Sequence, residues 1–487
     1  MTYPNLKFNG KRVTIEGNVR VVSPYPDIPA DTLRFEFLDG YDPTNPPEGS
    51  AYADYQTAKG TWSHVYGNVY DWTCHDPKWY VTGYGSTMQG PYIYSAFAST
   101  PVSNPGSYYA DTDGNPLANK KFRIIGGNTS NITHMPKLFY KVGNFCRGIG
   151  WFDTHNVVNA SGMFLWQSNN GMHVPTLPDF DFSGITNDEL TDEDIKSADR
   201  TNFVGLYQWC SGNKSISVVP SITFPSNRAI STKNMFNGCT SLESANIVGL
   251  NSSDAEGMFS NKIRISTPSF TNCTLNNPKS LFGVGSGSTS YPVTVTMSNV
   301  ALTGSANSMF RGCSALTAVP SFDASGLTSL AYAFRNCVRL TSVPQLNTSN
   351  VIDFGGTFQG CSVLTTVPLL DTSSADTIAS MFADCTSLQT FPLFNTANVT
   401  RMSSTFNGCR ALTAIPLFNT AKVTDMYRTF YNCYNVASGS LAMYQQASTQ
   451  ETPPSNYNGT FTNCGRDTVT GAAELAMIPA DWGGTGS

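Results

Sequence analysis

Six cysteines recur along this 487-residue chain at one constant interval. They are Cys313, Cys337, Cys361, Cys385, Cys409 and Cys433, so each number is 24 higher than the last. A fixed spacing indicates a repeat protein, in which each unit packs against its neighbours along an extended array. One ordinary globular domain is excluded by the length, unless the chain is such an array.

Other residues repeat in step with the cysteines. Phenylalanine stands three positions before each of them, at Phe310, Phe334, Phe358, Phe382, Phe406 and Phe430. Leucine follows at Leu316, Leu340, Leu364, Leu388 and Leu412, and an apolar residue then precedes a proline in each unit. These columns predict the apolar core of a stacked solenoid.

The period predicts an α/β solenoid of the leucine-rich-repeat type, since coils of roughly 20 to 29 residues hold a strand and a short helix. We expect the strand at the L-T-x-V-P segment, which is rich in β-branched residues. Val423, Met426 and Phe430 lie at offsets 0, 3 and 7, and this spacing predicts a helix of about two turns. Small polar residues are expected to turn the chain between them, at Asn347, Asp371, Asn395 and Asn419.

Weaker copies extend the array towards the N-terminus. Ile132, Met135 and Phe139 repeat the spacing of Val423, Met426 and Phe430. Allowing for insertions, we expect about 13 coils between residues 121 and 480, forming a rod roughly 60 Å long at the usual strand spacing.

The composition divides the chain into five parts. Residues 1–30 form an extended attachment segment, and residues 31–120 form an aromatic-rich β domain or an N-terminal cap. Residues 121–300 hold irregular repeats with insertions, 301–436 hold the regular 24-residue repeats, and 437–487 form a C-terminal cap. Caps are expected because the end of a solenoid would otherwise expose its apolar cross-section.

The repeat consensus M-F-x-G-C-x-x-L-T-x-V-P-x-F-x-T-x-x-V-T-x-M closely resembles the BspA-like leucine-rich repeat. That class occurs in bacterial surface lipoproteins and in proteins of bacteriophages that infect gut bacteria. The stretch from Phe461 to Trp482 looks like the end-cap that phage-associated members carry. This resemblance implies a surface-displayed binding solenoid without enzymatic activity.

Charge and hydropathy narrow the function classes. The net charge of −5 gives no basic surplus for a general nucleic-acid surface. No segment approaches the roughly 20 apolar residues that span a bilayer, and the first residues lack the apolar stretch of a secretory signal. A missing leader favours a virion protein assembled in the host cytoplasm over an exported adhesin.

The cysteine column allows three interpretations: disulfides, metal ligands or core. Stacked side chains point the same way rather than at each other, and neither C-x-x-C nor histidine partners accompany them. We therefore expect buried, reduced thiols, with no metal and no cofactor. Asp179 and Asp181 are the nearest approach to paired carboxylates, but a D-x-D loop is usually solvated, so no enzyme is expected.

Two groups of residues are candidates for binding. The first follows the column leucine and forms a polar face, at Thr317, Thr341, Thr365, Gln389 and Thr413. The second could stack on sugar rings, at Trp62, Trp72 and Trp79. Solvated strands favour threonine, and small β domains bury tryptophan, so both groups also have structural interpretations. If binding is specific, we expect it among the irregular coils 121–300, where insertions interrupt the repeat and vary the side chains on the surface.

The preferred hypothesis is a bacteriophage virion protein on capsid or tail, held by other virion proteins through its N-terminal region. It would bind glycan or protein of a host or mucosal surface, without nucleic acid or membrane insertion. The alternative is a BspA-like adhesin of the bacterial cell surface, and a phage depolymerase is a third hypothesis. A homo-oligomer is compatible with the sequence, although no coiled-coil heptads support one.

Overall fold

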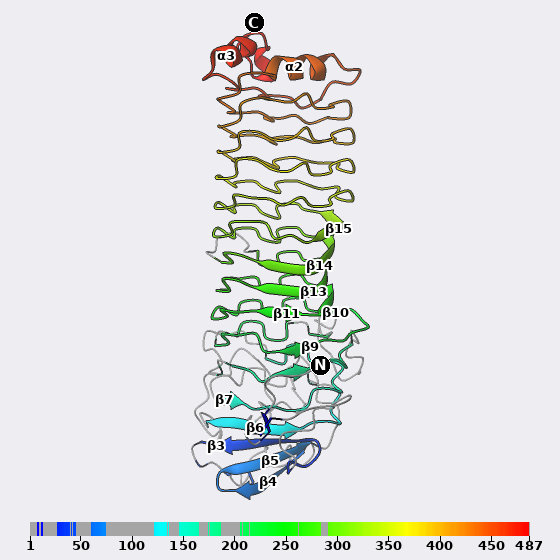
Figure 1. The fold of residues 1–487 in the computed structure, drawn as a ribbon, viewed down its shortest axis with the longest axis vertical. Helices are drawn as coiled ribbons and strands as arrows, with labels where there is room; N and C mark the ends of the chain where they lie inside the picture. The colour runs from blue at the N-terminus through cyan, green and yellow to red at the C-terminus, as the bar shows by residue number, and fades with distance from the viewer. Residues whose placement is uncertain are drawn as a thin grey trace, which may run out of the picture.

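The computed structural model describes residues 7–8, 11–12, 27–38, 40, 42–44, 60–74, 121–133, 135, 146–164, 174, 176–186, 205–206, 208–213, 215–261, 263–283 and 291–486. They build one elongated stack of coils, with a β-sheet at one end and short helices at the other (Figure 1). Two short strands, β1 (Lys7–Phe8) and β2 (Lys11–Arg12), pair antiparallel.

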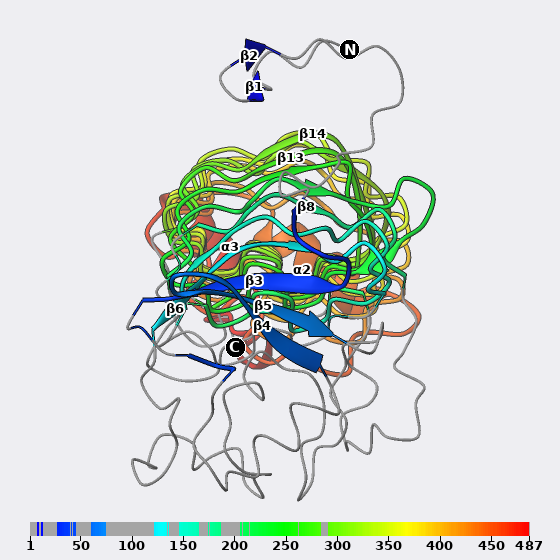
Figure 2. The same cartoon turned by 90° about the horizontal axis from the view of Figure 1, so that it is seen from below.

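The N-terminal end of the stack is a five-stranded sheet in the order β4-β5-β3-β6-β7. Its strands are β3 (Thr32–Phe37), β4 (Gly60–Tyr66), β5 (Val69–Cys74), β6 (Phe122–Asn128) and β7 (Cys146–Ile149). All pairs are antiparallel except β6 with β7, which is parallel. The strand β6 therefore joins the antiparallel strands of this sheet to the parallel stacking of the solenoid, and β3 to β5 cover the first coil (Figures 1 and 2).

The next coils vary in length and hold the longest strands. Parallel pairing joins β8 (Phe180–Asp181) to β9 (Ile222–Thr223), and β10 (Ile230–Ser231) to β12 (Asn251–Asp254). The strands β10 and β12 belong to a six-stranded parallel sheet. Its other four strands are β11 (Asn246–Val248), β13 (Ser269–Asn276), β14 (Thr296–Ser305) and β15 (Asp323–Ser329).

Beyond β15 the coils become regular. Isolated bridges join Ser329, Asp353, Thr377, Arg401 and Asp425, each 24 residues after the last. The solenoid has about seven turns of the 24-residue period, where we expected about 13 coils. The difference arises because the other turns of the stack have different lengths, as in the step from Asp425 to Asn456.

The sequence predicts a helix and a strand in each regular coil, and this prediction is wrong because the backbone there forms mostly turns. Around Met426 to Phe430 the chain makes three-residue turns, in which Thr429 N donates to Met426 O. Arg428 has φ 53° and Asn432 φ 62°, a left-handed backbone that interrupts any α-helix. Other backbone N–H groups bond to the next coil, as Phe430 N does to Thr460 O. The L-T-x-V-P segment makes only isolated bridges, such as Ala318 with Ser342.

The core of the regular coils includes the predicted phenylalanine, cysteine and leucine columns, all of which are buried. Neighbouring rings from Phe310 to Phe430 are stacked with centroids 5.5 to 5.6 Å apart. Each thiol from Cys337 to Cys433 donates to the carbonyl of the phenylalanine one coil back, at 3.0 to 3.2 Å. All these cysteines are buried and free, and burial raises the pKa of the Cys385 thiol to about 12. No metal-binding cluster exists in the described part of the chain.

A helical cap closes the C-terminal end (Figure 1). It comprises α2 (Ser440–Thr449), α3 (Val469–Leu475) and the 3₁₀ turn η3 (Ala480–Trp482). The Glu474 carboxylate of α3 accepts hydrogen bonds from Gly439 N and Leu441 N, two donors that the start of α2 leaves without a partner inside the helix. Trp482 stacks on Tyr457 at 4.3 Å and covers the last ring of the column, Phe461. Among the described helices none is long and apolar enough to cross a membrane.

Candidate binding surfaces

The predicted polar face lies along the regular coils as one column. Thr341, Thr365, Gln389 and Thr413 are exposed, whereas Thr317 is half-buried. The backbone N–H of Thr341 donates to Thr317 O at 2.9 Å, and the Thr341 hydroxyl donates to the same carbonyl at 3.0 Å. This hydroxyl therefore joins neighbouring coils, which explains one of the threonines without any ligand.

A second exposed column was missed at the sequence level. Leu369, Leu393 and Leu417 are 55 %, 57 % and 53 % exposed, while the residue after each is buried. This leucine ridge is bounded at one end by Gln345, whose side-chain amide donates to Leu369 O at 2.7 Å. The signal was the Pro-Leu-apolar triplet, because strand-like alternation lets only one of two adjacent apolar residues face inward.

Two of the tryptophan candidates, Trp62 in β4 and Trp72 in β5, belong to the N-terminal sheet. Trp72 is buried, and Trp62 packs half-buried against it with ring centroids 5.2 Å apart. Trp62 also contacts Phe35 edge-on at 5.1 Å. A ring that is buried between others cannot offer its face to a sugar, so the binding interpretation of Trp72 is wrong. Trp79 lies outside the described residues.

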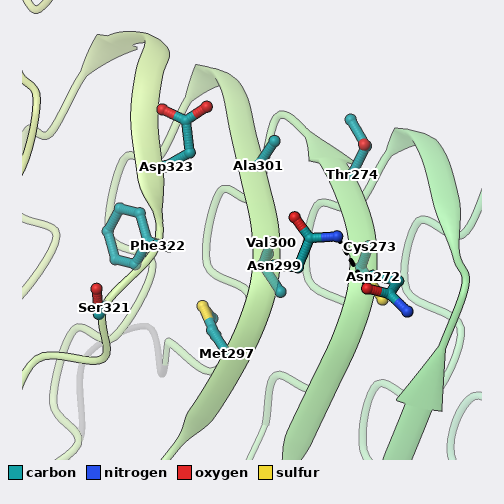
Figure 3. Close-up of a pocket in the computed structure, with 10 residues that line it drawn as sticks. All are labelled: Asn272, Cys273, Thr274, Met297, Asn299, Val300, Ala301, Ser321, Phe322 and Asp323. Carbon is teal, nitrogen blue, oxygen red and sulfur yellow. Dashed lines mark hydrogen bonds between the residues drawn. The ribbon is translucent and has the colours of Figure 1, made fainter.

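An open groove lies on the strands of the irregular coils, at the boundary with the regular ones. Its cavity volume is about 390 Å³. Figure 3 shows its ten lining residues, which are Asn272, Cys273, Thr274, Met297, Asn299, Val300, Ala301, Ser321, Phe322 and Asp323. They come from β13, β14, the first residue of β15 and the two residues before it, so three successive coils contribute.

The groove exists because the coil is longer here. The register pairs Ser269 with Thr296, and Asn272 and Asn299 likewise stand 27 residues apart, instead of 24. Asn272 and Asn299 both have φ 53°, and the ladder skips this pair. Their side chains meet, and Asn299 Nδ2 donates to Asn272 Oδ1 at 2.8 Å (Figure 3). Asparagine tolerates this left-handed backbone, which turns both amides away from the ladder.

The groove has an apolar floor and a polar rim. Cys273, Met297 and Phe322 are buried beneath it. On the rim, hydrogen bonds from Ser325 lower the pKa of Asp323, so its carboxylate is charged at neutral pH. Burial raises the pKa of the Cys273 thiol, which excludes a reactive thiolate. Asp323 is the only carboxylate among the ten lining residues, so this groove lacks the pair that hydrolyses glycosidic bonds.

Asp179 and Asp181 act as turn and ladder residues. Asp179 accepts from Ser221 N at 3.1 Å. Asp181 contacts His155 Nδ1 at 3.0 Å, and the Ser183 hydroxyl lies 3.1 Å from the same nitrogen. A catalytic serine triad needs the carboxylate and the hydroxyl on different ring nitrogens. This exposed cluster, which sequence reasoning did not find, therefore lacks the geometry of a nucleophilic site.

Comparisons with known proteins agree with the repeat. Residues 213–284 match the family described as "BspA type Leucine rich repeat region (6 copies)". Residues 117–190, 304–415 and 365–458 match "Mycoplasma protein of unknown function, DUF285". No curated protein matches the sequence.

Two solved structures are similar in part. One is a leucine-rich repeat protein from Bacteroides ovatus, at 13 % identity and TM-score 0.28, over 66 % of this chain and 75 % of the other. The second is a TLR13–ssRNA13 complex, at 11 % identity and TM-score 0.17, over 66 % of this chain and 58 % of the other. Residues 213–284 are thus similar to the BspA-type leucine-rich repeat, and the segments on either side of them are similar to the DUF285 family.

Proposed function

We propose that this chain is a non-enzymatic adhesin of the bacterial cell surface, which binds a glycan or protein of a host or mucosal surface. The observation that carries the proposal is the groove over β13, β14 and β15. Its apolar floor can pack against the carbon face of a ligand, and its amides and carboxylate can bond to hydroxyl or amide groups. The BspA-type match supports a repeat protein that works by binding.

Binding should depend on the rim of the groove. In the variant Asn272→Gly, Asn299→Gly and Asp323→Asn, glycine keeps the left-handed backbone while the amides and the charge are removed. The control is Ser308→Gly, because Ser308 has a similar φ of 57° outside the groove. We expect purified wild-type protein to bind members of a glycan and matrix-protein array. The groove variant should bind them at least tenfold more weakly, and equal binding by the variant would refute the groove as the site.

The cellular location needs a separate experiment. None of the families and structures named above is described as a phage protein. We therefore prefer the adhesin hypothesis to the virion hypothesis. An antibody against residues 301–436 should label intact producing bacteria. Label on purified phage particles, with none on the cells, would overturn this order and identify a virion component held through its N-terminal region. Loss of capsule on incubation with the protein would instead support a depolymerase.

A further inference from the structure

Arginines and tyrosines gather on the last regular coil, next to the C-terminal cap. The guanidinium carbon of Arg428 lies 4.9 Å from the ring centres of both Tyr427 and Tyr431. Tyr431 N donates to Arg428 O, so residues three apart in this tight turn project to the same side. One cation is thus held by two aromatic rings.

A second stack stands on the same coil. Tyr434 lies under Arg466 at 4.1 Å and near Arg410 at 5.6 Å. Arg410 and Tyr434 follow Cys409 and Cys433, so they occupy equivalent positions of adjacent coils. Tyr434 lies six positions after Arg428, which keeps their Cα atoms within about 20 Å of each other. We name these three arginines and three tyrosines the Arg–Tyr patch.

The patch is a local excess of positive charge on a chain whose net charge is −5. Arg410 and Arg428 are exposed, and neither forms an ion pair with any residue that the structure describes. Arg466 contacts Asp467 at 3.1 Å, a solvent-exposed pair that contributes little. By contrast, Arg401 elsewhere on the rod is paired with Asp376 at 3.2 Å.

Stacking prepares these arginines to bind an anion. A guanidinium that lies on a ring uses its flat face, while its N–H donors in the plane remain open to a carboxylate or sulfate. The ring also restricts the side chain before binding, which lowers the entropy cost of ordering it. Tyrosine edges and hydroxyls add contacts that suit a polar ring such as a pyranose.

We propose that the Arg–Tyr patch is a second binding site, specific for acidic polysaccharides whose sulfate or carboxylate groups pair with Arg410, Arg428 and Arg466. The site is separate from the groove and does not depend on it. A nucleic acid is disfavoured because binding along its backbone needs a longer basic track than three arginines on an acidic protein.

The test measures binding of the full chain to immobilised polysaccharides at low and physiological salt. Chondroitin sulfate carries sulfate and carboxylate, hyaluronan carries carboxylate only, and dextran is uncharged. We expect binding to chondroitin sulfate that weakens with salt, and none to dextran. Binding to hyaluronan as well would assign the recognition to carboxylate, and its absence to sulfate. Failure to bind either acidic polymer would overturn the proposal.

A pair of triple variants separates the patch from net charge. Arg410→Gln, Arg428→Gln and Arg466→Gln should weaken binding at least tenfold. The control, Arg264→Gln, Arg339→Gln and Arg401→Gln, removes the same charge from other exposed positions and should stay within twofold of wild type. Equal losses in both would refute a specific site, as would tighter binding of a single-stranded oligonucleotide. The groove variant described above should bind the acidic polymers normally, so failure of one proposal leaves the other testable.

Discussion

The regular coils after β15, from Leu330 to Ser438, and the irregular coils before them use the same core but differ at the surface. In both, phenylalanine rings stack along the axis, at 5.3 Å between Phe236 and Phe259 and 5.6 Å between Phe334 and Phe358. The irregular coils up to β15 add residues to the period, form the long strands β13 and β14, and open the groove. Identical repeats thus provide length and stability, while departures from the period provide shape.

The largest effect on stability is expected from alkaline pH, which acts on the buried cysteines of the core. Buried thiols keep their protons to a higher pH than thiols of the unfolded chain, so the unfolded state loses protons first and stability falls as the pH rises from about 8.5 towards 12. Between pH 8.5 and pH 10, each buried thiol should lower the free energy of unfolding by about 2 kcal/mol.

A cysteine variant isolates this contribution. The triple variant Cys361→Ala, Cys385→Ala and Cys409→Ala is expected to be less stable than wild type at pH 7. Over the same pH range, however, its free energy of unfolding should fall by about 6 kcal/mol less than that of wild type. Urea unfolding followed by circular dichroism at several pH values measures the slope. Because the tyrosines and lysines are unchanged, parallel slopes would show that the column does not titrate as described.

Removing one ring should break the regular array into two units. Phe358 is stacked at 5.6 Å on both sides, and Phe358→Ala should cost about 3–5 kcal/mol. Since each coil contacts only its neighbours, coils on either side should then unfold separately. Phe259→Ala in the irregular coils should lower the free energy of unfolding by a similar amount. Urea unfolding of both variants, compared by the number and midpoints of the transitions, tests this expectation. A single unshifted transition would contradict the stacked core.

A smaller effect is expected from a buried hydroxyl that only some coils possess. Thr405 Oγ1 donates to Ile378 O at 3.1 Å and Met402 O at 2.6 Å. The equivalent positions of irregular coils hold Met235 and Met258. Thr405→Val keeps the shape but leaves those carbonyls without the hydroxyl donor, at a cost of about 1–2 kcal/mol. The exposed control, Thr424→Val, should change the urea midpoint much less.

The smallest effect should come from the turn residues of the regular coils. Asn395 Oδ1 accepts from Ala397 N at 3.1 Å, and Asn347, Asp371 and Asn419 make the same turn. Asn395→Ala should cost about 0.5–1 kcal/mol, because the exposed N–H can bond to water instead. A loss above about 2 kcal/mol, which is typical of a buried donor left unpaired, would mean that the turn supports the whole stack.

The period, the buried columns and the polar turn residues could be predicted because burial imposes one residue type on each position. The helix could not, because offsets of 0, 3 and 7 also describe inward-pointing corners of a coil. A better signal was present in the residue before each cysteine: Gly312, Asn336, Gly360, Asp384, Gly408 and Asn432, all with φ between 60° and 77°. These residue types favour a left-handed backbone that no helix interior accepts.

The groove itself was not predicted; only a region for specific binding, residues 121–300, was named from the sequence, and four of the ten lining residues lie beyond it. Insertions marked coils 121–300 as the place for specificity, yet Asn272 and Asn299 are 27 residues apart and reveal their pairing only in the register of β13 and β14. The Arg–Tyr patch has the same origin, since Arg410, Tyr434 and Arg466 meet across successive coils rather than along the chain.

The constant step between regular coils has a consequence for inheritance. Because every regular coil bonds to its neighbours through the same backbone groups, gain or loss of whole units by recombination between the similar repeats leaves the backbone hydrogen-bond pattern, the ring stacking and both ends in place. Such events would move the Arg–Tyr patch nearer to or farther from the groove without altering either site. Related strains are then expected to differ in the reach of this protein before they differ in what it recognises.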